Sequence, residues 1–160
     1  MADMLVNLLN LPDCSEDMER IKSEGINIRR IRAYERSLLS DFVLSTFHRG
    51  WADEVMSAFS HHPVSCFVAT KNGRIIGFAA YECTVRNFFG PTGVEESFRG
   101  LGVGRVLLIE CLKAMREMGY VYAIIGGVGP AGFYEKCCGA FEIPGSSPGI
   151  YTDALKGDED

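Results

Sequence analysis

One short segment, Arg99-Gly100-Leu101-Gly102-Val103-Gly104, constrains the fold more than any other part of this chain. Its glycines come directly before a stretch in which apolar and charged side chains alternate with a helical period. The apolar face consists of Leu107, Leu108, Cys111, Leu112, Ala114, Met115 and Met118, and the opposite face of Glu110, Lys113, Arg116 and Glu117. This pattern predicts a helix that packs one side on a core and ends at Gly119.

The segment before the loop, residues 87–94, has the character of a strand interrupted by glycine and proline. A strand, a glycine-rich loop and a helix therefore follow one another. The first turn of a helix has unpaired N–H groups and the positive end of the helix dipole, and glycines leave room for an anion to reach them. Arg99 adds a forked, permanently charged donor. The loop is therefore predicted to bind phosphate groups.

Two common phosphate-binding loops do not fit this segment. The dinucleotide-binding pattern G-x-G-x-x-G requires its last glycine where the chain has Arg105 or Leu107, depending on the glycine at which the pattern starts. The P-loop requires Gly-Lys followed by Ser or Thr, and the chain has no such sequence here. What remains is the pattern Arg-x-x-Gly-x-Gly at the start of a helix.

That pattern resembles the pyrophosphate-binding motif of the GCN5-related N-acetyltransferases, the GNAT family. Thr92-Gly93-Val94 precedes it at the spacing where those enzymes place the strand end that pairs with pantetheine. Further on, residues 129–136 and Gly139-Ala140-Phe141 are similar to the family segment Ala-x-x-Phe-Tyr-x-Lys-x-Gly-Phe. The resemblance spans residues 75–142, which is about half of the chain.

The resemblance implies transfer of an acetyl group from acetyl-CoA to a primary amine, by direct attack within a ternary complex. It implies that Tyr134 protonates the leaving thiolate, and the alternative is that this side chain simply packs on the cofactor. Backbone N–H groups around Val94, where two strands are expected to bulge and part, would polarise the thioester carbonyl. The residues expected to bind the cofactor are Thr92, Gly93, Val94, Arg99, Gly100, Leu101, Gly102, Val103, Gly104, Arg105, Pro130 and Phe133.

The acceptor and the general base are not identified by the sequence. We favour a small-molecule amine over a protein as the acceptor, and a non-catalytic module that binds acetyl-CoA or a partner protein is the alternative function. A glutamate that some family members carry has no match in Arg86-Asn87-Phe88-Phe89. Glu82, Glu95, His61 and His62 are candidate bases, and loss of the proton to water is the alternative.

A rival motif lies near the C-terminus, where Gly145-Ser146-Ser147-Pro148-Gly149 matches G-x-S-x-G literally. The nucleophile elbow of a hydrolase needs a strand before it, a helix after it and a histidine later in the chain. The histidines of this chain all lie upstream, and the prolines favour a loop. We expect a loop near the acceptor pocket, followed by a closing strand at Ile150-Tyr151.

The composition narrows the classes of partner. The chain has 160 residues with 16 basic and 21 acidic side chains, and it has no basic, aromatic-rich stretch, so nucleic acid is not expected as a partner. The six cysteines form no C-x-x-C pair and no Cys/His cluster at zinc spacing, so no metal is expected, and buried reduced thiols are expected at Cys66 and Cys111. Neither a leader peptide nor a membrane-spanning run is recognised, so a cytoplasmic enzyme without a membrane partner is expected. Whether the chain forms a homodimer is left open.

We expect an α/β chain of the α+β type. Residues 1–25 are predicted to form a strand-helix extension packed on the domain, residues 26–156 a single GNAT acetyltransferase domain, and residues 157–160 an acidic tail. Helices are expected at 15–24, 34–47 and 51–60, and strands at 26–32, 64–70, 75–82 and 120–125, with a hairpin turn at Asn72-Gly73. The predicted fold is a GNAT-like mixed, mostly antiparallel central sheet with helices on both faces.

Overall fold

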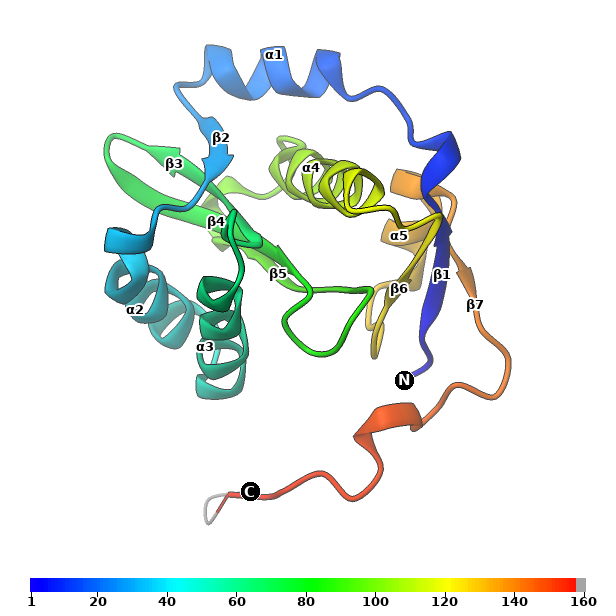
Figure 1. Cartoon of the computed structure of the whole chain (residues 1–160). Coiled ribbons are helices and arrows are strands. Elements are labelled where there is room, and N and C mark those ends of the chain that lie inside the picture. The colour runs from blue at the N-terminus through cyan, green and yellow to red at the C-terminus, as the bar shows by residue number, and fades with distance from the viewer. Residues whose placement is uncertain (158–160) are drawn as a thin grey trace.

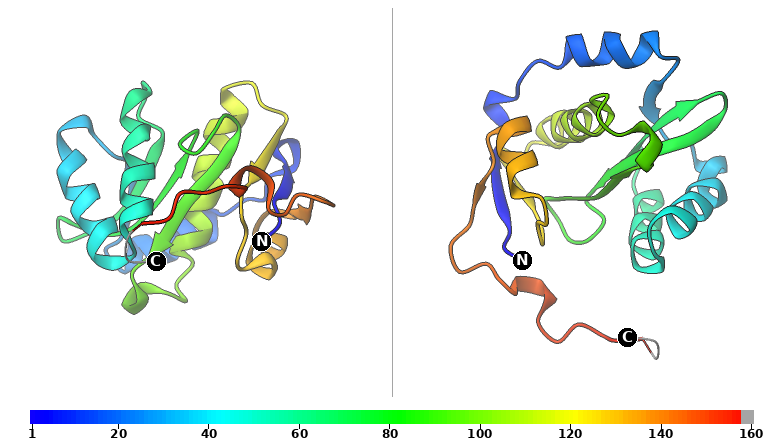
Figure 2. Two further views of the ribbon diagram at one scale, coloured as in Figure 1. Left: turned by 90° about the horizontal axis from the view of Figure 1, so that it is seen from below. Right: turned by 180° about the vertical axis from the view of Figure 1, so that it is seen from behind.

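Within residues 1–157, the part of the chain that the computed structural model describes, seven strands form one sheet (Figures 1 and 2). The strands lie in the order β2-β3-β4-β5-β6-β1-β7. Their bounds are β1 Met4–Asn7, β2 Asn27–Arg30, β3 Cys66–Lys71, β4 Arg74–Tyr81, β5 Phe88–Val94, β6 Tyr122–Ile125 and β7 Phe141–Glu142. The strands β5 and β6 are parallel, and the other neighbours are antiparallel. The predicted mixed, mostly antiparallel sheet is therefore confirmed.

Helices cover both faces of this sheet, as predicted. The α-helices are α1 Ser15–Ser23, α2 Arg36–Thr46, α3 Arg49–Met56, α4 Val103–Glu117 and α5 Ala131–Cys138. Short 3-10 helices are η1 Leu8–Asn10, η2 Ala33–Glu35, η3 Ser57–Ser60, η4 Glu96–Phe98 and η5 Gly149–Tyr151. Helices α1, α4 and α5 lie on one face, and α2 and α3 on the other (Figure 1). Side chains alternate along β4, so that Phe78 and Ala80 enter the core under α2 and α3, while Ala79 enters the core under α4.

The predicted elements are present, with shifts at their ends. At the hairpin turn Asn72 and Gly73 have φ of 52° and 74°, the left-handed conformations that a two-residue Asn-Gly turn requires. The helix predicted at 51–60 begins earlier, at Arg49, and continues as a 3-10 helix. The predicted strand at Ile150-Tyr151 is wrong. These residues belong to η5, because the Tyr151 N–H donates to the Pro148 carbonyl (3.1 Å) in a local turn while β7 forms the edge of the sheet. The predicted acidic tail lies, apart from Gly157, outside the described residues.

The strand nearest the N-terminus lies inside the sheet. It pairs with β6 on one side and with β7 on the other, and its Met4 and Val6 side chains are fully buried. Just before it, the buried carboxylate of Asp3 accepts a hydrogen bond from the Gly127 N–H (2.8 Å), and the Asp3 N–H donates to Ser146 Oγ (2.8 Å). The chain before β1 thereby holds both the end of β6 and the C-terminal segment. The division into residues 1–25 and 26–156 stays a prediction.

A bidentate ion pair orders the chain between β2 and α2. The Arg29 guanidinium donates to both Glu35 oxygens, at 2.8 and 2.6 Å, and the Arg32 N–H donates to Glu35 Oε1 (2.9 Å). These bonds, led by the one from the Arg29 side chain, lower the pKa of Glu35 to about 2. The ion pair thereby joins the end of β2 to the start of α2, the helix that leads to Phe47 and α3 at the site described below.

We predict that the Arg29 to Glu35 ion pair makes the protein more sensitive to acid. The folded-state pKa lies below the ordinary value of 4.5, so the stabilisation is present above about pH 4.5 and is lost as the pH falls toward about 2. The free energy of unfolding, measured by urea titration between pH 7 and pH 3, should fall less steeply in Glu35→Gln than in the unchanged protein. The exposed Glu24→Gln is the control and should retain the original slope. If the free energy of unfolding falls equally steeply with pH in all three proteins, the Arg29 to Glu35 ion pair is not the source of the acid sensitivity.

Candidate active site

A cavity of about 1290 Å³ opens beside the sheet, between β5 and β6. Its walls come from α3 and the residues before it, from β5, from the loop that begins α4, and from the start of α5. The end of β6 and the C-terminal segment complete it, through Gly126, Gly127, Pro148 and Tyr151. The expected loop near the pocket is thus present at Gly145–Gly149, but it forms a turn and a 3-10 helix and not the strand-helix elbow of a hydrolase.

The cavity exists because β5 and β6 part soon after they meet. In the described chain their pairing joins Phe88 to Ile124 and Phe89 to Ile125, and β5 then continues to Val94 with β4 alone. The ladder between β4 and β5 has a register shift here, with Tyr81 opposite Phe89 but Ala79 opposite Thr92. The extra residue of this bulge therefore lies at Gly90-Pro91, and the expected position around Val94 is wrong. Proline cannot donate to a ladder, which favours this position.

Backbone groups of β5 face the space left by β6. The Glu95 N–H donates to the Ile76 carbonyl (2.9 Å). In an antiparallel ladder this bond determines which residues of β5 point their N–H and C=O groups toward β4 and which point them away. By alternation, the N–H and C=O groups of Thr92 and Val94 point away from β4 and toward the cavity. The Val94 carbonyl indeed accepts a hydrogen bond from Arg99 Nε (3.1 Å), outside the sheet. These residues thus offer a free strand edge to an extended ligand.

The start of α4 forms the second part of the site. Gly100 and Gly102 have φ of 85° and 94°, so the loop adopts left-handed conformations that favour glycine. No side chain caps α4, and the first bond within the helix runs from the Val106 N–H to the Gly102 carbonyl (3.1 Å). The N–H groups of residues 103–105 therefore lack acceptors within the helix and point toward the position of an anion.

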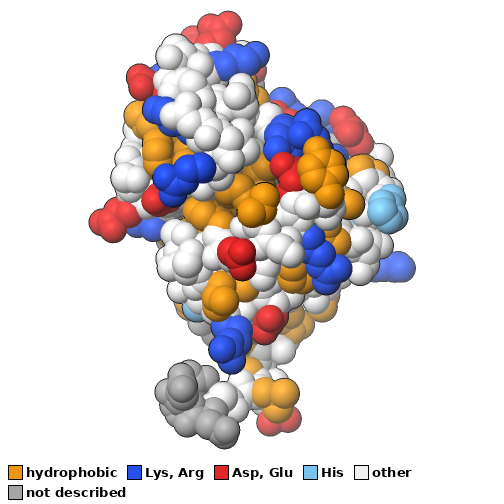
Figure 3. Space-filling view, turned by 90° about the vertical axis from the view of Figure 1, so that its left-hand side faces the viewer, with side chains coloured by type: hydrophobic (Ala, Val, Ile, Leu, Met, Phe, Trp, Pro, Cys, Tyr) orange, Lys and Arg blue, Asp and Glu red, His pale blue; other side chains and the backbone are white. Residues whose placement is uncertain are grey.

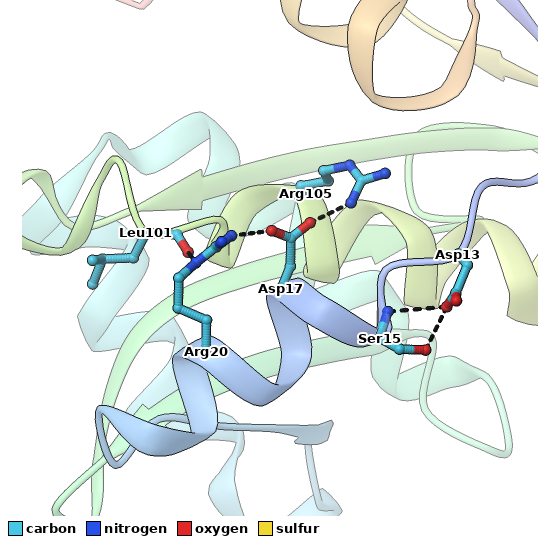
Figure 4. A network of polar contacts seen from close by, with 6 residues as sticks. All are labelled: Asp13, Ser15, Asp17, Arg20, Leu101 and Arg105. Atoms are coloured by element: carbon cyan, nitrogen blue, oxygen red, sulfur yellow. Dashed lines mark hydrogen bonds and ion pairs between the residues drawn. The ribbon is translucent and has the colours of Figure 1, made fainter.

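Helix α1 supports this loop through polar contacts that the sequence did not reveal (Figure 4). Asp17 accepts hydrogen bonds from Arg20 and from Arg105 on α4, and Arg20 Nε donates to the Leu101 carbonyl (3.2 Å). Arg20, Arg99 and Arg105 line the cavity together. The spacing of Asp17 and Arg20 places them on one helix face, but nothing in the sequence indicates that this face meets the loop. Of the residues expected to bind the cofactor, all but Leu101 line the cavity.

Tyr134 lies where α5 meets the cavity. Its ring is buried and makes edge contacts with Phe133 (5.1 Å between ring centroids) and Phe89 (6.2 Å). Burial, with a smaller effect from the nearby thiols of Cys138 and Cys137, raises the pKa of Tyr134 to about 12. The phenol is therefore neutral near pH 7 and keeps its O–H group for donation.

The other end of the cavity is aromatic and carries a carboxylate. Trp51 and Glu54, three residues apart on α3, both line it, together with Phe47, His48 and Thr84. The Phe47 and Trp51 rings pack with centroids 5.3 Å apart, and the Thr84 hydroxyl donates to Glu54 Oε1. We did not single out these residues from the sequence, although an i, i+3 spacing on the predicted helix indicates a shared face.

The four candidate bases lie elsewhere in the described structure. Glu82 is buried and accepts a hydrogen bond from the Asn87 N–H (2.6 Å), and it lines a second, smaller cavity of about 290 Å³ with His61 and His62. Glu95 does not line either cavity. The prediction of buried thiols at Cys66 and Cys111 is confirmed, and burial raises the pKa of both.

The comparisons with known proteins agree with this geometry. The model of a family described as the acetyltransferase (GNAT) family matches residues 31–140. The chain belongs to this family. Acetyl-CoA, the predicted cosubstrate, is the acetyl donor of GNAT enzymes, and a free helix start, a cradle of glycines and three arginines suit its phosphates. A comparison with curated protein sequences finds no match.

Solved structures show the same fold at low sequence identity. One is the GCN5-related glucosamine N-acetyltransferase region of a fungal multi-domain β-N-acetylglucosaminidase, with 18% identity, a TM-score of 0.68, and coverage of 89% of this chain and 19% of that chain. Another is a GCN5-related N-acetyltransferase from Sphaerobacter thermophilus, with 18% identity, a TM-score of 0.64, and coverage of 89% and 48%. The chain thus spans about a fifth and about half of these two proteins.

We predict that Gly104→Ala weakens acetyl-CoA binding without harming the fold. The added Cβ would lie at ordinary contact distances, 3.6 Å from Phe133 Cζ and 3.7 Å from Val94 Cγ2, so it enters the cavity and not the core. Acetyl-CoA at about a hundred times its Kd should stabilise the unchanged protein by about 2.7 kcal/mol. In the variant we expect the Kd, measured by calorimetry, to rise about tenfold while the Tm without ligand stays the same or rises.

Gly132→Ala on α5 is the matched control, because its added Cβ would meet nothing within 4 Å. It should leave the Kd for acetyl-CoA unchanged. If Gly104→Ala binds acetyl-CoA with an unchanged Kd, the phosphates bind away from the start of α4.

Proposed function

We propose that this chain is an acetyl-CoA-dependent N-acetyltransferase that acetylates a primary amine of a small molecule by direct attack in a ternary complex. One observation carries the proposal: a single cavity is lined by the free start of α4, by the parted strands, by Tyr134, and by Trp51 and Glu54 of α3. A donor bound along β5 therefore leaves room for an acceptor in the same cavity.

The donor end is supported by two kinds of backbone group. The start of α4, with Arg20, Arg99 and Arg105 around it, suits a pyrophosphate. The outward-facing N–H and C=O groups of Thr92 and Val94 suit the amides of pantetheine, which would extend the sheet like an added strand. Together they would place the thioester where β5 and β6 part.

The reaction then needs three contributions from the protein. A backbone N–H group on the free edge of β5 would stabilise the negative charge on the thioester oxygen as the amine attacks. As the new C–N bond forms and the C–S bond breaks, Tyr134 would donate its proton to the departing sulfur.

The proton of the amine is proposed to leave through water. None of Glu82, Glu95, His61 and His62 lines the cavity in the described residues. The cavity has an open path to solvent, which suits a proton acceptor that does not belong to the protein.

A small-molecule acceptor is favoured because residues from several elements surround the cavity. Pro148 and Tyr151 from the C-terminal segment line it together with residues of α3 and β5. On the face shown in Figure 3, Lys and Arg are interspersed with Asp and Glu, and no large area of one charge is visible. None of the helices within residues 1–157 is long and apolar enough to cross a membrane. A cytoplasmic location remains a prediction, and whether the chain forms a homodimer is left open.

The alternative, a module that binds acetyl-CoA without turnover, predicts binding alone. It is less well supported, because a ligand-binding module has no need of a buried tyrosine next to the parted strands. Release of free CoA with a panel of primary amines distinguishes the two.

We predict that Tyr134→Phe lowers kcat by about 10²-fold or more while the Kd for acetyl-CoA stays nearly constant. The ring and its contacts with Phe89 and Phe133 remain, and the proton donor is lost. Because the pKa of Tyr134 is raised to about 12, the phenol keeps its proton below about pH 11. In that range its ionisation should not reduce kcat. Steady-state CoA release from pH 6 to pH 10 and calorimetry measure both effects.

The exposed Tyr122→Phe, outside the cavity, is the control and should behave like the unchanged protein. A normal kcat in Tyr134→Phe would show that water, and not Tyr134, donates the proton to the departing sulfur. Loss of acetyl-CoA affinity with an unchanged kcat would reduce Tyr134 to a packing residue.

A further inference from the structure

The charges that line the large cavity are separated into two groups. Its arginines come from α1, from the loop before α4 and from α4 itself. Among the described residues that line the cavity, the carboxylate is that of Glu54, which comes from α3. The arginines suit the phosphates of the donor, so the negative group belongs to the end that would hold the acceptor.

Glu54 is held in place but is not neutralised. Its Oε1 atom accepts a hydrogen bond from the Thr84 hydroxyl, and no Lys or Arg in the described residues forms an ion pair with it. Its side chain is only partly exposed. A carboxylate held in a partly apolar cavity without a cationic partner binds a cationic ligand favourably, because the ligand replaces part of the lost hydration.

The surroundings of Glu54 add to this preference. Trp51 lies on the same face of α3 and packs on Phe47, and an indole face attracts a cation. Tyr151 lies nearby, and its pKa is raised by burial and then by the charges of Glu54 and Asp3. The carboxylates of Glu54 and Asp3 therefore both lie close enough to act on this phenol.

We propose that the acceptor is an amine with a second group that stays cationic during the reaction, and that Glu54, with Trp51 beside it, binds that second group. This inference rests on the proposed function. The nitrogen that attacks must be neutral, whereas a carboxylate in contact with it would favour its protonated form. Glu54 is therefore suited to a charge that persists throughout the reaction, with the reacting amine placed nearer to Tyr134.

The test compares two acceptors of equal length, 1,5-diaminopentane and 5-amino-1-pentanol, by their kcat/KM for CoA release. The unchanged protein should prefer the diamine by about tenfold or more. Glu54→Gln preserves the shape of the side chain and an oxygen that can accept the hydrogen bond from Thr84. It should raise the KM for the diamine enough to remove the preference for the diamine over the amino alcohol. Its kcat/KM for the amino alcohol, which has no second charge, should change much less than that for the diamine. The neighbouring, exposed Asp53→Asn is the control and should keep the preference.

The outcomes separate this inference from the proposed function. Equal turnover of both acceptors by the unchanged protein, or a preference that survives in Glu54→Gln, would overturn the role of Glu54 and leave the acetyltransferase intact. No CoA release with either acceptor would count against turnover. Calorimetry of 1,5-diaminopentane with the protein saturated with CoA would then test the cation site by itself. Binding that is lost in Glu54→Gln supports the cation site, and no binding to the unchanged protein rejects it.

Discussion

The parting of β5 from β6 is the constraint on which the rest of the site depends. Two neighbouring strands normally satisfy each other's N–H and C=O groups, and a separation leaves those groups without partners. Here the bulge at Gly90-Pro91 turns β5 away after a short parallel pairing, and β6 ends at Ile125. The unpaired edge of β5 is stable because it faces a cavity that water or a ligand enters. Helix α4 packs across β3, β4 and β5 and keeps this half of the sheet in place.

The chain outside the matched range of 31–140 shapes both ends of the cavity. At the donor end, α1 provides Asp17 and Arg20, which connect the loop before α4 to Arg105. At the acceptor end, Asp3 holds Gly127 and the C-terminal segment, and Tyr151 packs close to Gly126 and Gly127. The β1 strand makes this possible because it completes the sheet between β6 and β7 and fixes the position of Asp3. These segments therefore contribute to the site and do not merely extend the domain.

The charged groups that line the cavity match the charges of the two substrates that we propose. Arginines and the start of α4 make one end positive, and Glu54 makes the other end negative. Tyr134 lines the same cavity, buried among aromatic rings and neutral at ordinary pH. Such an arrangement orients a donor that carries phosphates and an acceptor that carries a positive charge in opposite directions, with their reactive groups in the middle.

The sequence by itself determined what depends on neighbours along the chain. The glycine-rich loop, the amphipathic α4 and the Asn72-Gly73 turn were predictable, because glycine conformations and helical periodicity are local properties. The family resemblance placed Tyr134 and most of the loop residues at the cavity. The tertiary structure alone decided that the bulge lies at Gly90-Pro91, that Leu101 turns its carbonyl to Arg20, and that Ile150-Tyr151 form a turn. It also brought Arg20, Glu54 and Asp3 to the site. The placement of Arg20, Glu54 and Asp3 depends on contacts between segments far apart in the chain, for which the local pattern of residues carries no signal.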